Sequence, residues 1–163
     1  MKKCFFILTI FLLNACKNNS LLKTGREGKP IPQFSLLLPD SISYFNTKSL
    51  PAGKPVVMFL FSPQCPYCKA QVRAITEDIN ELKDIQFLIF TIPPFNGMKT
   101  FYDEFKLANY KNITTGIDTG NFFGNYFKTV QVPYLAIYGK NQKLNQSFLG
   151  KIYISQIKKV AFQ

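Results

Sequence analysis

The chain has 163 residues, which is enough for one domain of ordinary size. Its 47% hydrophobic and 18% charged residues are typical of a globular protein and exclude a disordered or fibrous chain. It contains no histidine, which excludes Ser–His and Cys–His nucleophile pairs and histidine-ligated zinc, and its 20 basic and 9 acidic residues give a net charge of +11.

The chain begins with two basic residues and a short hydrophobic run. Lys2 and Lys3 precede Phe5–Leu13, which is too short for a membrane-spanning helix of about 20 apolar residues. This pattern predicts a secretory signal peptide over residues 1–15. It closes with Leu13-Asn14-Ala15-Cys16, which resembles the lipobox of bacterial lipoproteins, where the cysteine is lipidated and becomes the new N-terminus. An uncleaved anchor and a secreted protein with a free Cys16 are the alternatives.

Cleavage before Cys16 would remove Cys4 and leave Cys65 and Cys68 as the thiols of the mature chain. Residues 16–29 are polar and basic, and they predict a lipidated cysteine followed by a flexible tether that holds the folded part close to a bilayer. The folded domain is expected over residues 30–163. Outside the cytosol, such a basic chain is expected to contact an anionic membrane surface or an acidic protein rather than nucleic acid. A merely solvated basic face is the alternative.

From Pro30 onward, apolar runs alternate with helical periodicities. Strands are predicted at 34–38, 56–61, 85–92, 134–138 and 143–149. Helices are predicted from Val72 to Leu82, around Phe101–Ala108, and at 154–162. Pro93-Pro94 ends the third strand, and the last two strands form a hairpin. This order predicts an α/β fold with a central mixed sheet and helices on both faces.

The motif Cys65-Pro66-Tyr67-Cys68 falls between the strand at 56–61 and the helix that carries Val72. A CxxC at a strand-to-helix turn is typical of redox exchange. The helix N-terminus and the charge of Lys69 are expected to favour the thiolate of Cys65, and Pro66 suits the first helical turn. Cys68 lies one turn further on and can attack a mixed disulfide on Cys65.

Two other uses of these cysteines are alternatives to redox exchange. A structural disulfide between Cys65 and Cys68 would close almost no chain and contribute little stability. A tetrahedral metal site needs four ligands, and two thiols without histidine do not provide them. The sequence therefore predicts no metal and no bound cofactor.

Three segments together resemble the thioredoxin superfamily: Gly53–Cys68 with its Phe-Ser-Pro-Gln-Cys-Pro-Tyr-Cys string, Gly28–Leu36, and Val132–Gly139. They are most similar to membrane-tethered, TlpA-like thioredoxins. The resemblance implies a thioredoxin-like fold in which Cys65 is the nucleophile, Cys68 resolves, and a redox-active disulfide joins them. It also implies a cis Pro133 that faces both cysteines and leaves the backbone of Val132 free to pair with a substrate strand. An ordinary proline at the start of a strand is the alternative.

Two positions depart from the superfamily pattern. Phe59 stands where cytosolic thioredoxins carry a buried acid that handles the proton of the resolving thiol, and Gln64 stands where they carry Trp. The sequence indicates no replacement acid.

The leading hypothesis is a lipid-anchored thiol–disulfide oxidoreductase that faces the periplasm or the cell exterior and acts on protein disulfides or dithiols. TlpA-like relatives are mostly reductants supplied by a membrane electron donor, which favours reduction here. Pro66 and Tyr67 tune the potential but do not fix the direction of electron flow.

Two alternatives stay open. A peroxiredoxin-like peroxidase would use Ser62 as the hydroxyl three residues before Cys65, although Met58 stands where that chemistry needs a proline. A non-enzymatic binding lipoprotein on a thioredoxin scaffold is the other.

Overall fold

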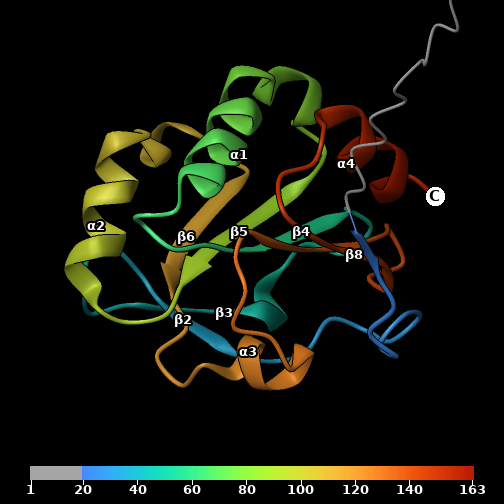
Figure 1. Ribbon diagram of the computed structural model, residues 1–163, viewed down its shortest axis with the longest axis horizontal. Helices are drawn as coiled ribbons and strands as arrows, with labels where there is room; N and C mark the ends of the chain where they lie inside the picture. The colour runs from blue at the N-terminus through green and yellow to red at the C-terminus, as the bar shows by residue number, and fades with distance from the viewer. Residues whose placement is uncertain (1–19) are drawn as a thin grey trace, which may run out of the picture.

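The computed structural model describes residues 20–163, so the predicted signal peptide and Cys16 lie outside the described residues. Within this part, eight strands form one sheet against which four α-helices and three short 3-10 helices pack (Figure 1). The strands are β1 (Ser20–Leu22), β2 (Ser35–Leu37), β3 (Tyr44–Asn46), β4 (Val56–Leu60), β5 (Gln86–Thr91), β6 (Ile113–Ile117), β7 (Tyr134–Tyr138) and β8 (Leu144–Leu149). The α-helices are α1 (Pro66–Glu77), α2 (Phe95–Glu104), α3 (Phe122–Phe127) and α4 (Ile154–Ala161), and the 3-10 helices are η1 (Thr47–Ser49), η2 (Ile79–Leu82) and η3 (Leu107–Asn109).

The strands follow the order β1-β8-β7-β4-β5-β6-β2-β3 across the sheet. At its centre β4 pairs in parallel with β5 and antiparallel with β7, and β7 continues into β8 as an antiparallel hairpin. All five residues of β4 are buried. The predicted α/β architecture, with a parallel crossover first and a hairpin last, is therefore confirmed.

Helices cover both faces of this sheet (Figure 1). Val57 and Phe59 of β4 pack in one core cluster with residues of α1, α2 and α4. The alternate residues Val56, Met58 and Leu60 pack in a second cluster with α3 and with residues of β2. The strand is apolar at every position because both of its faces are covered, as is usual for a strand in a parallel part of a sheet.

The predicted elements correspond to β2, β4, β5, β7, β8, α1, α2 and α4, and among the strands and α-helices four were missed. The missed elements are β1, β3, β6 and α3. The sequence of β6, Ile-Thr-Thr-Gly-Ile, contains no continuous apolar run that would predict a strand. The strand forms because β6 pairs with β5 and β2. Helix α3 spans only six residues and contains a glycine, so it carries no helical periodicity to read.

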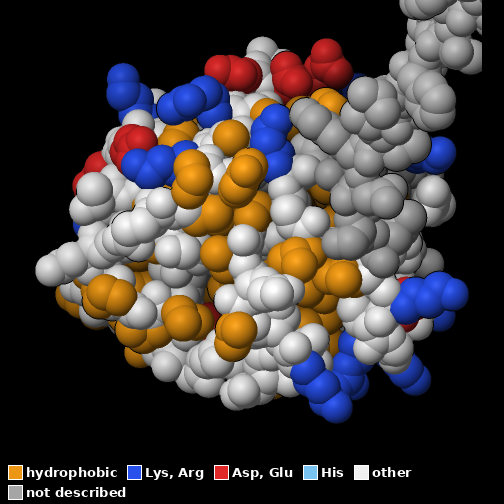
Figure 2. Space-filling view, in the orientation of Figure 1, with side chains coloured by type: hydrophobic (Ala, Val, Ile, Leu, Met, Phe, Trp, Pro, Cys, Tyr) orange, Lys and Arg blue, Asp and Glu red, His pale blue; other side chains and the backbone are white. Residues whose placement is uncertain are grey.

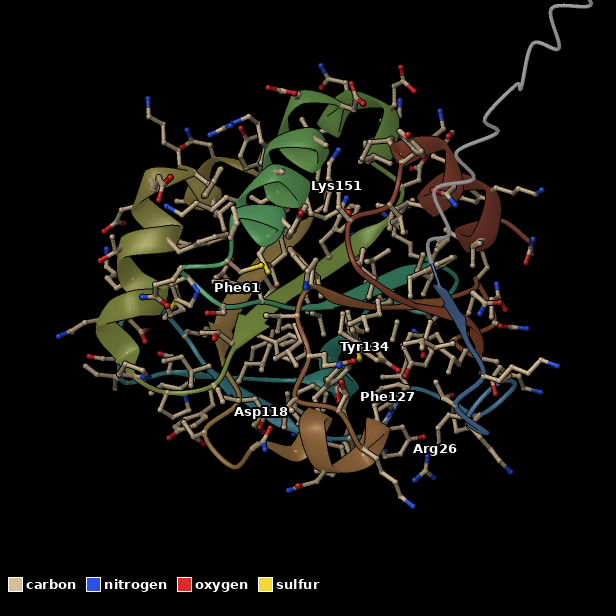
Figure 3. All side chains as sticks on the ribbon, in the orientation of Figure 1. Arg26, Phe61, Asp118, Phe127, Tyr134 and Lys151 are labelled. Atoms are coloured by element: carbon tan, nitrogen blue, oxygen red, sulfur yellow. The ribbon has the colours of Figure 1, made fainter. Side chains whose placement is uncertain are left out.

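The expectation of a flexible tether over residues 16–29 is wrong for residues 20–29. Strand β1 pairs antiparallel with β8, and the amide of Gly28 donates to the carbonyl of Leu144 at 2.8 Å. The guanidinium of Arg26 lies 4.2 Å from the ring centroid of Tyr126 on α3 (Figure 3). The segment is held against the domain because β1 pairs with backbone N–H and C=O groups of β8 that would otherwise be unpaired at the edge of the sheet.

None of the helices between residues 20 and 163 is long and apolar enough to cross a membrane.

The contact between β2 and β6 requires a glycine at position 116. A Cβ there would lie 2.7 Å from the carbonyl oxygen of Leu37 and 2.9 Å from Cβ of Leu36. We expect Gly116→Ala to lower the free energy of unfolding by about 1–3 kcal/mol, because overpacking forces the strands apart. Urea denaturation followed by circular dichroism measures this change.

Gly120→Ala is the matched control, since no heavy atom lies within 4 Å of a Cβ at Gly120. We expect it to change stability by less than about 0.5 kcal/mol. Equal losses in the two variants would contradict the close packing of β2 on β6.

Candidate functional site

The two cysteines lie at the turn that joins β4 to α1. Cys65 is the N-cap of α1 in an extended conformation, and Pro66 occupies the first helical turn, where its missing N–H is not needed. The backbone amide of Cys68 donates to Sγ of Cys65 at 3.1 Å. Both thiols are free. A helix N-terminus therefore presents its unpaired donors to the sulfur of Cys65, as the sequence predicted.

The two thiols differ in their surroundings. Cys65 is partly exposed, whereas Cys68 is fully buried in the core beside Val72 and Ile75. Burial raises the pKa of the Cys68 thiol far above its usual range, and the hydrogen bond with Cys65 makes a smaller contribution in the same direction. Cys65 is therefore the more accessible of the two thiols, and Cys68 lies behind it in the core.

The bond between Val132 and Pro133 is cis, as predicted. Pro133 comes directly before β7, whose first residue Tyr134 pairs with Leu60 at the end of β4. This register brings Val132 and Pro133 alongside the residues that lead from β4 to Cys65. Val132 is half-buried and packs against the same core cluster as Cys65. Residues far apart in sequence thus meet at one end of the sheet.

A groove of about 320 Å³ lies beside Cys65 at this end of the sheet. Its walls come from the turn after β4, the loop after β5, and the loop between α3 and β7. They are formed by Leu60, Phe61, Ser62, Pro63, Gln64, Thr91, Ile92, Pro93, Pro94, Gly97, Asn121, Thr129, Val130 and Val132. The sequence indicated Val132 as a substrate contact and Pro93-Pro94 only as the end of a strand. The structure brings both into one groove.

Asp118 is a buried acid that the sequence analysis missed. Its carboxylate accepts hydrogen bonds from the amides of Phe122 and Phe123, at 2.9 and 2.7 Å, and so caps the start of α3 (Figure 3). Its own amide donates to the carbonyl of Thr91 at 2.9 Å. Asp118 thereby holds together two walls of the groove. Asn121 is the N-cap of α3 and Asp118 lies three residues before it, so the usual N-cap position did not indicate this acid.

No carboxylate occupies the position of Phe59, which is fully buried in the apolar cluster that contains Cys68. Its ring centroid lies 6.2 Å from that of Phe61, which in turn stacks on Phe101 of α2 at 4.1 Å. The thiol of Cys68 therefore lies among apolar side chains on this side.

The side chains that were predicted to tune the thiols lie on α1. Tyr67 is 67% exposed, and Lys69 is half-buried. The ammonium of Lys69 lies 2.7 Å from Oε2 of Glu104 on α2. This ion pair was not indicated by the sequence, and it reduces the net positive charge that Lys69 brings to Cys65.

Within residues 20–163, no group of three or more histidine, cysteine, aspartate or glutamate side chains is placed to hold a metal ion.

The family model described as Redoxin matches residues 26–156. No curated protein matches the chain. Among solved structures, the chain is similar to dsbF of Mycobacterium tuberculosis (MTB), with 21% identity, a TM-score of 0.66, and coverage of 79% of this chain and 92% of that one.

Two further structures show the range of these similarities. A secreted disulfide oxidoreductase of Mycobacterium tuberculosis, homologous to E. coli DsbE, has 20% identity, a TM-score of 0.61, and coverage of 78% of this chain and 92% of that one. A 2-Cys peroxiredoxin of Plasmodium vivax has 12% identity, a TM-score of 0.65, and coverage of 83% and 94%. At these identities the similarity concerns the fold alone.

The different burial of the two thiols predicts different reactivity. We expect Cys65, in a Cys68→Ser variant, to react with iodoacetamide at neutral pH at least about tenfold faster than Cys68 in a Cys65→Ser variant. The reason is that Cys68 is buried and the burial raises its pKa. Mass spectrometry over time measures both rates. Unfolding in guanidinium should remove the difference, and equal rates in the folded variants would reverse the roles assigned to the two thiols.

Proposed function

The chain belongs to the Redoxin family, and from this membership we propose that it exchanges disulfides with proteins through Cys65 and Cys68. The resemblance to the thioredoxin superfamily is confirmed, and the fold is that of thioredoxin-like oxidoreductases. The observation that carries the proposal is the pair of unequal thiols at the start of α1, one partly exposed and one buried.

In the reducing direction, the thiolate of Cys65 attacks one sulfur of a substrate disulfide. A mixed disulfide forms, and the other substrate sulfur leaves as a thiolate that takes up a proton. Cys68 then loses its proton and attacks Sγ of Cys65, which releases the second substrate thiol and leaves a Cys65–Cys68 disulfide. Two electrons pass from the protein to the substrate. The amide of Cys68 stabilises the sulfur of Cys65 at both stages, because it donates to that atom.

The fully buried position of Cys68 determines the order of these reaction steps. A substrate can reach Cys65 but not Cys68, so the first attack always involves Cys65. The raised pKa of Cys68 keeps this thiol protonated until the mixed disulfide has formed. Phe59 supplies no carboxylate for the proton, so we propose that the proton leaves through the turn that carries Cys65, towards solvent.

The backbone of Val132 is proposed to bind the substrate. Val132 precedes β7 and is half-buried beside the groove, so an extended substrate segment can pair with it while a substrate sulfur lies over Cys65. A protein with an exposed disulfide in an extended segment fits such a contact.

We further propose that the chain is a lipoprotein outside the cytosol, anchored through Cys16. The basic start, the short hydrophobic run and the lipobox-like Leu13-Asn14-Ala15-Cys16 support this location. A membrane electron donor would then return the Cys65–Cys68 disulfide to the dithiol.

A peroxidase is the second candidate, because Ser62 stands three residues before Cys65 and the fold is also similar to a peroxiredoxin. One observation opposes the peroxidase. Met58 stands where that chemistry needs a proline, and its side chain is fully buried in the core on the α3 face of the sheet. The hydroxyl of Ser62 lies 3.4 Å from Oε1 of Gln64 rather than on Cys65.

Trapping of a mixed disulfide tests the proposed exchange. We expect Cys68→Ser to accumulate a covalent complex with proteins that contain a disulfide. The reason is that Cys65 attacks the substrate disulfide and no second thiol resolves the mixed disulfide. Non-reducing gel electrophoresis detects the complex. Cys65→Ser is the matched control and should trap nothing, and complexes that form through Cys68 instead would contradict the mechanism.

The wild-type chain should reduce insulin disulfides in the presence of a dithiol. Rapid consumption of hydrogen peroxide without insulin reduction would favour the peroxidase, and inactivity in both assays would favour a binding protein with a static disulfide.

Anchoring is tested by the Cys16→Ser variant. We expect the wild-type chain to carry a lipid label and to fractionate with membranes, and we expect Cys16→Ser to lose both properties because the lipobox position no longer holds a cysteine. Metabolic labelling with a fatty acid measures the first property and detergent partitioning measures the second. A wild-type chain without lipid label would overturn the anchoring.

A further inference from the structure

The register of β1 determines at which end of the sheet the N-terminal segment enters. Ser20 pairs with Leu149 of β8, Leu149 pairs with Tyr134 of β7, and Tyr134 pairs with Leu60 of β4. These four residues lie in one row across the sheet. Cys65 follows Leu60 in the chain, so β1 begins at the same end of the sheet as the candidate active site.

The distance along that row is short. Neighbouring strands lie about 4.8 Å apart, so Ser20 lies about 14 Å from the end of β4. Cys16 precedes Ser20 by four residues, and four residues span at most about 14 Å when they are extended. A lipid on Cys16 would therefore hold this end of the sheet near the bilayer, because the chain between Cys16 and β1 is too short to let the opposite end of the domain face the bilayer.

The loops at this end of the sheet expose apolar side chains. Val130 is 89% exposed, Tyr67 67% and Tyr153 57%, and Ile92 is also exposed. Each comes from a different segment: Tyr67 from the first turn of α1, Ile92 from the loop after β5, Val130 from the loop before β7 and Tyr153 from the loop after β8. In the view of Figure 2, hydrophobic side chains gather across the middle of the face, and both acidic and basic side chains lie along its margins.

The charges at this end are positive. Lys128 and Lys151 are exposed in the loops before β7 and after β8. Lys151 lies next to α1, because the amide of its neighbour Ile152 donates to Gln71 of that helix at 2.8 Å (Figure 3). The segments 62–67, 92–96, 119–121, 128–133 and 150–153, which comprise the loops and the first helical residues at this end, contain no acidic residue. Asp118, which precedes one of them, is buried and caps α3, and Glu104 on the flank is paired with Lys69.

We propose that the end of the sheet that carries Cys65 rests on a surface of anionic phospholipid. Tyrosine and aliphatic side chains together with lysine suit the boundary between headgroups and acyl chains. The proposal rests on the lipid anchoring proposed above and deepens it, since it adds the orientation of the domain. It also narrows the partner class: the disulfides and dithiols that reach Cys65 belong to proteins whose cysteines lie at the membrane surface.

Quenching of a fluorophore by lipid tests the orientation. In lipidated protein that carries Cys65→Ser and Cys68→Ser, a single bimane is attached at Val130→Cys or at Ala52→Cys. Ala52 is exposed and precedes β4, so it lies at the opposite end of the sheet. The protein is bound to vesicles of phosphatidylcholine and phosphatidylglycerol that contain nitroxide-labelled lipid. We expect quenching at position 130 to exceed that at position 52 severalfold.

A charge-reversal pair tests the contribution of the lysines. We expect Lys128→Glu with Lys151→Glu to reduce the quenching at position 130 in these vesicles, and to have no effect in vesicles of phosphatidylcholine alone. Lys83→Glu with Lys111→Glu is the matched control, because both lysines are exposed and precede the starting ends of β5 and β6. This control should leave the quenching unchanged.

The outcomes separate the two proposals. If the protein floats with vesicles but both labels are quenched equally, or position 52 is quenched more, the orientation is overturned while anchoring stands. If the protein does not float with vesicles, the anchoring fails and the orientation fails with it. Thiol exchange is measured separately by the trapping of substrate on Cys65, and neither result affects it.

Discussion

The antiparallel pairing of β4 with β7 is the constraint on which the site depends. It places Tyr134 opposite Leu60, and it therefore brings the cis bond of Val132 and Pro133 beside the turn that leads to Cys65. Neither segment could form the site alone. The pairing is stable because β4 is buried on both faces, under α1, α2 and α4 on one side and under α3 on the other, so separating β4 from β7 would expose an entirely apolar strand to solvent.

Chemistry at this turn depends on a difference in burial within one helical turn. The sulfur of Cys65 lies at the start of α1, where it accepts the amide of Cys68, while the sulfur of Cys68 points into the core. The low polarity that raises the pKa of Cys68 also surrounds Phe59, which leaves no acid to share the proton. The same core that fixes the helix therefore also determines which thiol reacts first.

The groove beside Cys65 depends on residues outside the motif. Asp118 binds two amides of α3 and is joined through its own amide to Thr91, so hydrogen bonds connect the ends of β5 and β6 to the start of α3. The N-terminal segment is likewise part of the domain, because β1 completes the edge of the sheet beside β8. As a result, the chain before Ser20 starts at the end of the sheet that carries the site.

The sequence alone determined the features that arise within short stretches of chain: the strand–turn–helix around Cys65-Pro66-Tyr67-Cys68, the buried strands β4 and β5, the hairpin of β7 and β8, and the family resemblance with its cis Pro133. Apolar runs, helical periodicity and turn residues act locally, so a pattern of a few residues carries them. Only the tertiary structure decided the rest. Strand β6 forms because β5 and β2 pair with it, Lys69 meets Glu104 across two helices, and Asp118 joins two loops. Residues 20–22, expected to belong to a flexible tether, form strand β1 because they pair with the edge of β8. These contacts link residues that are distant in sequence, and the free energy that selects them comes from packing and pairing that no local pattern contains.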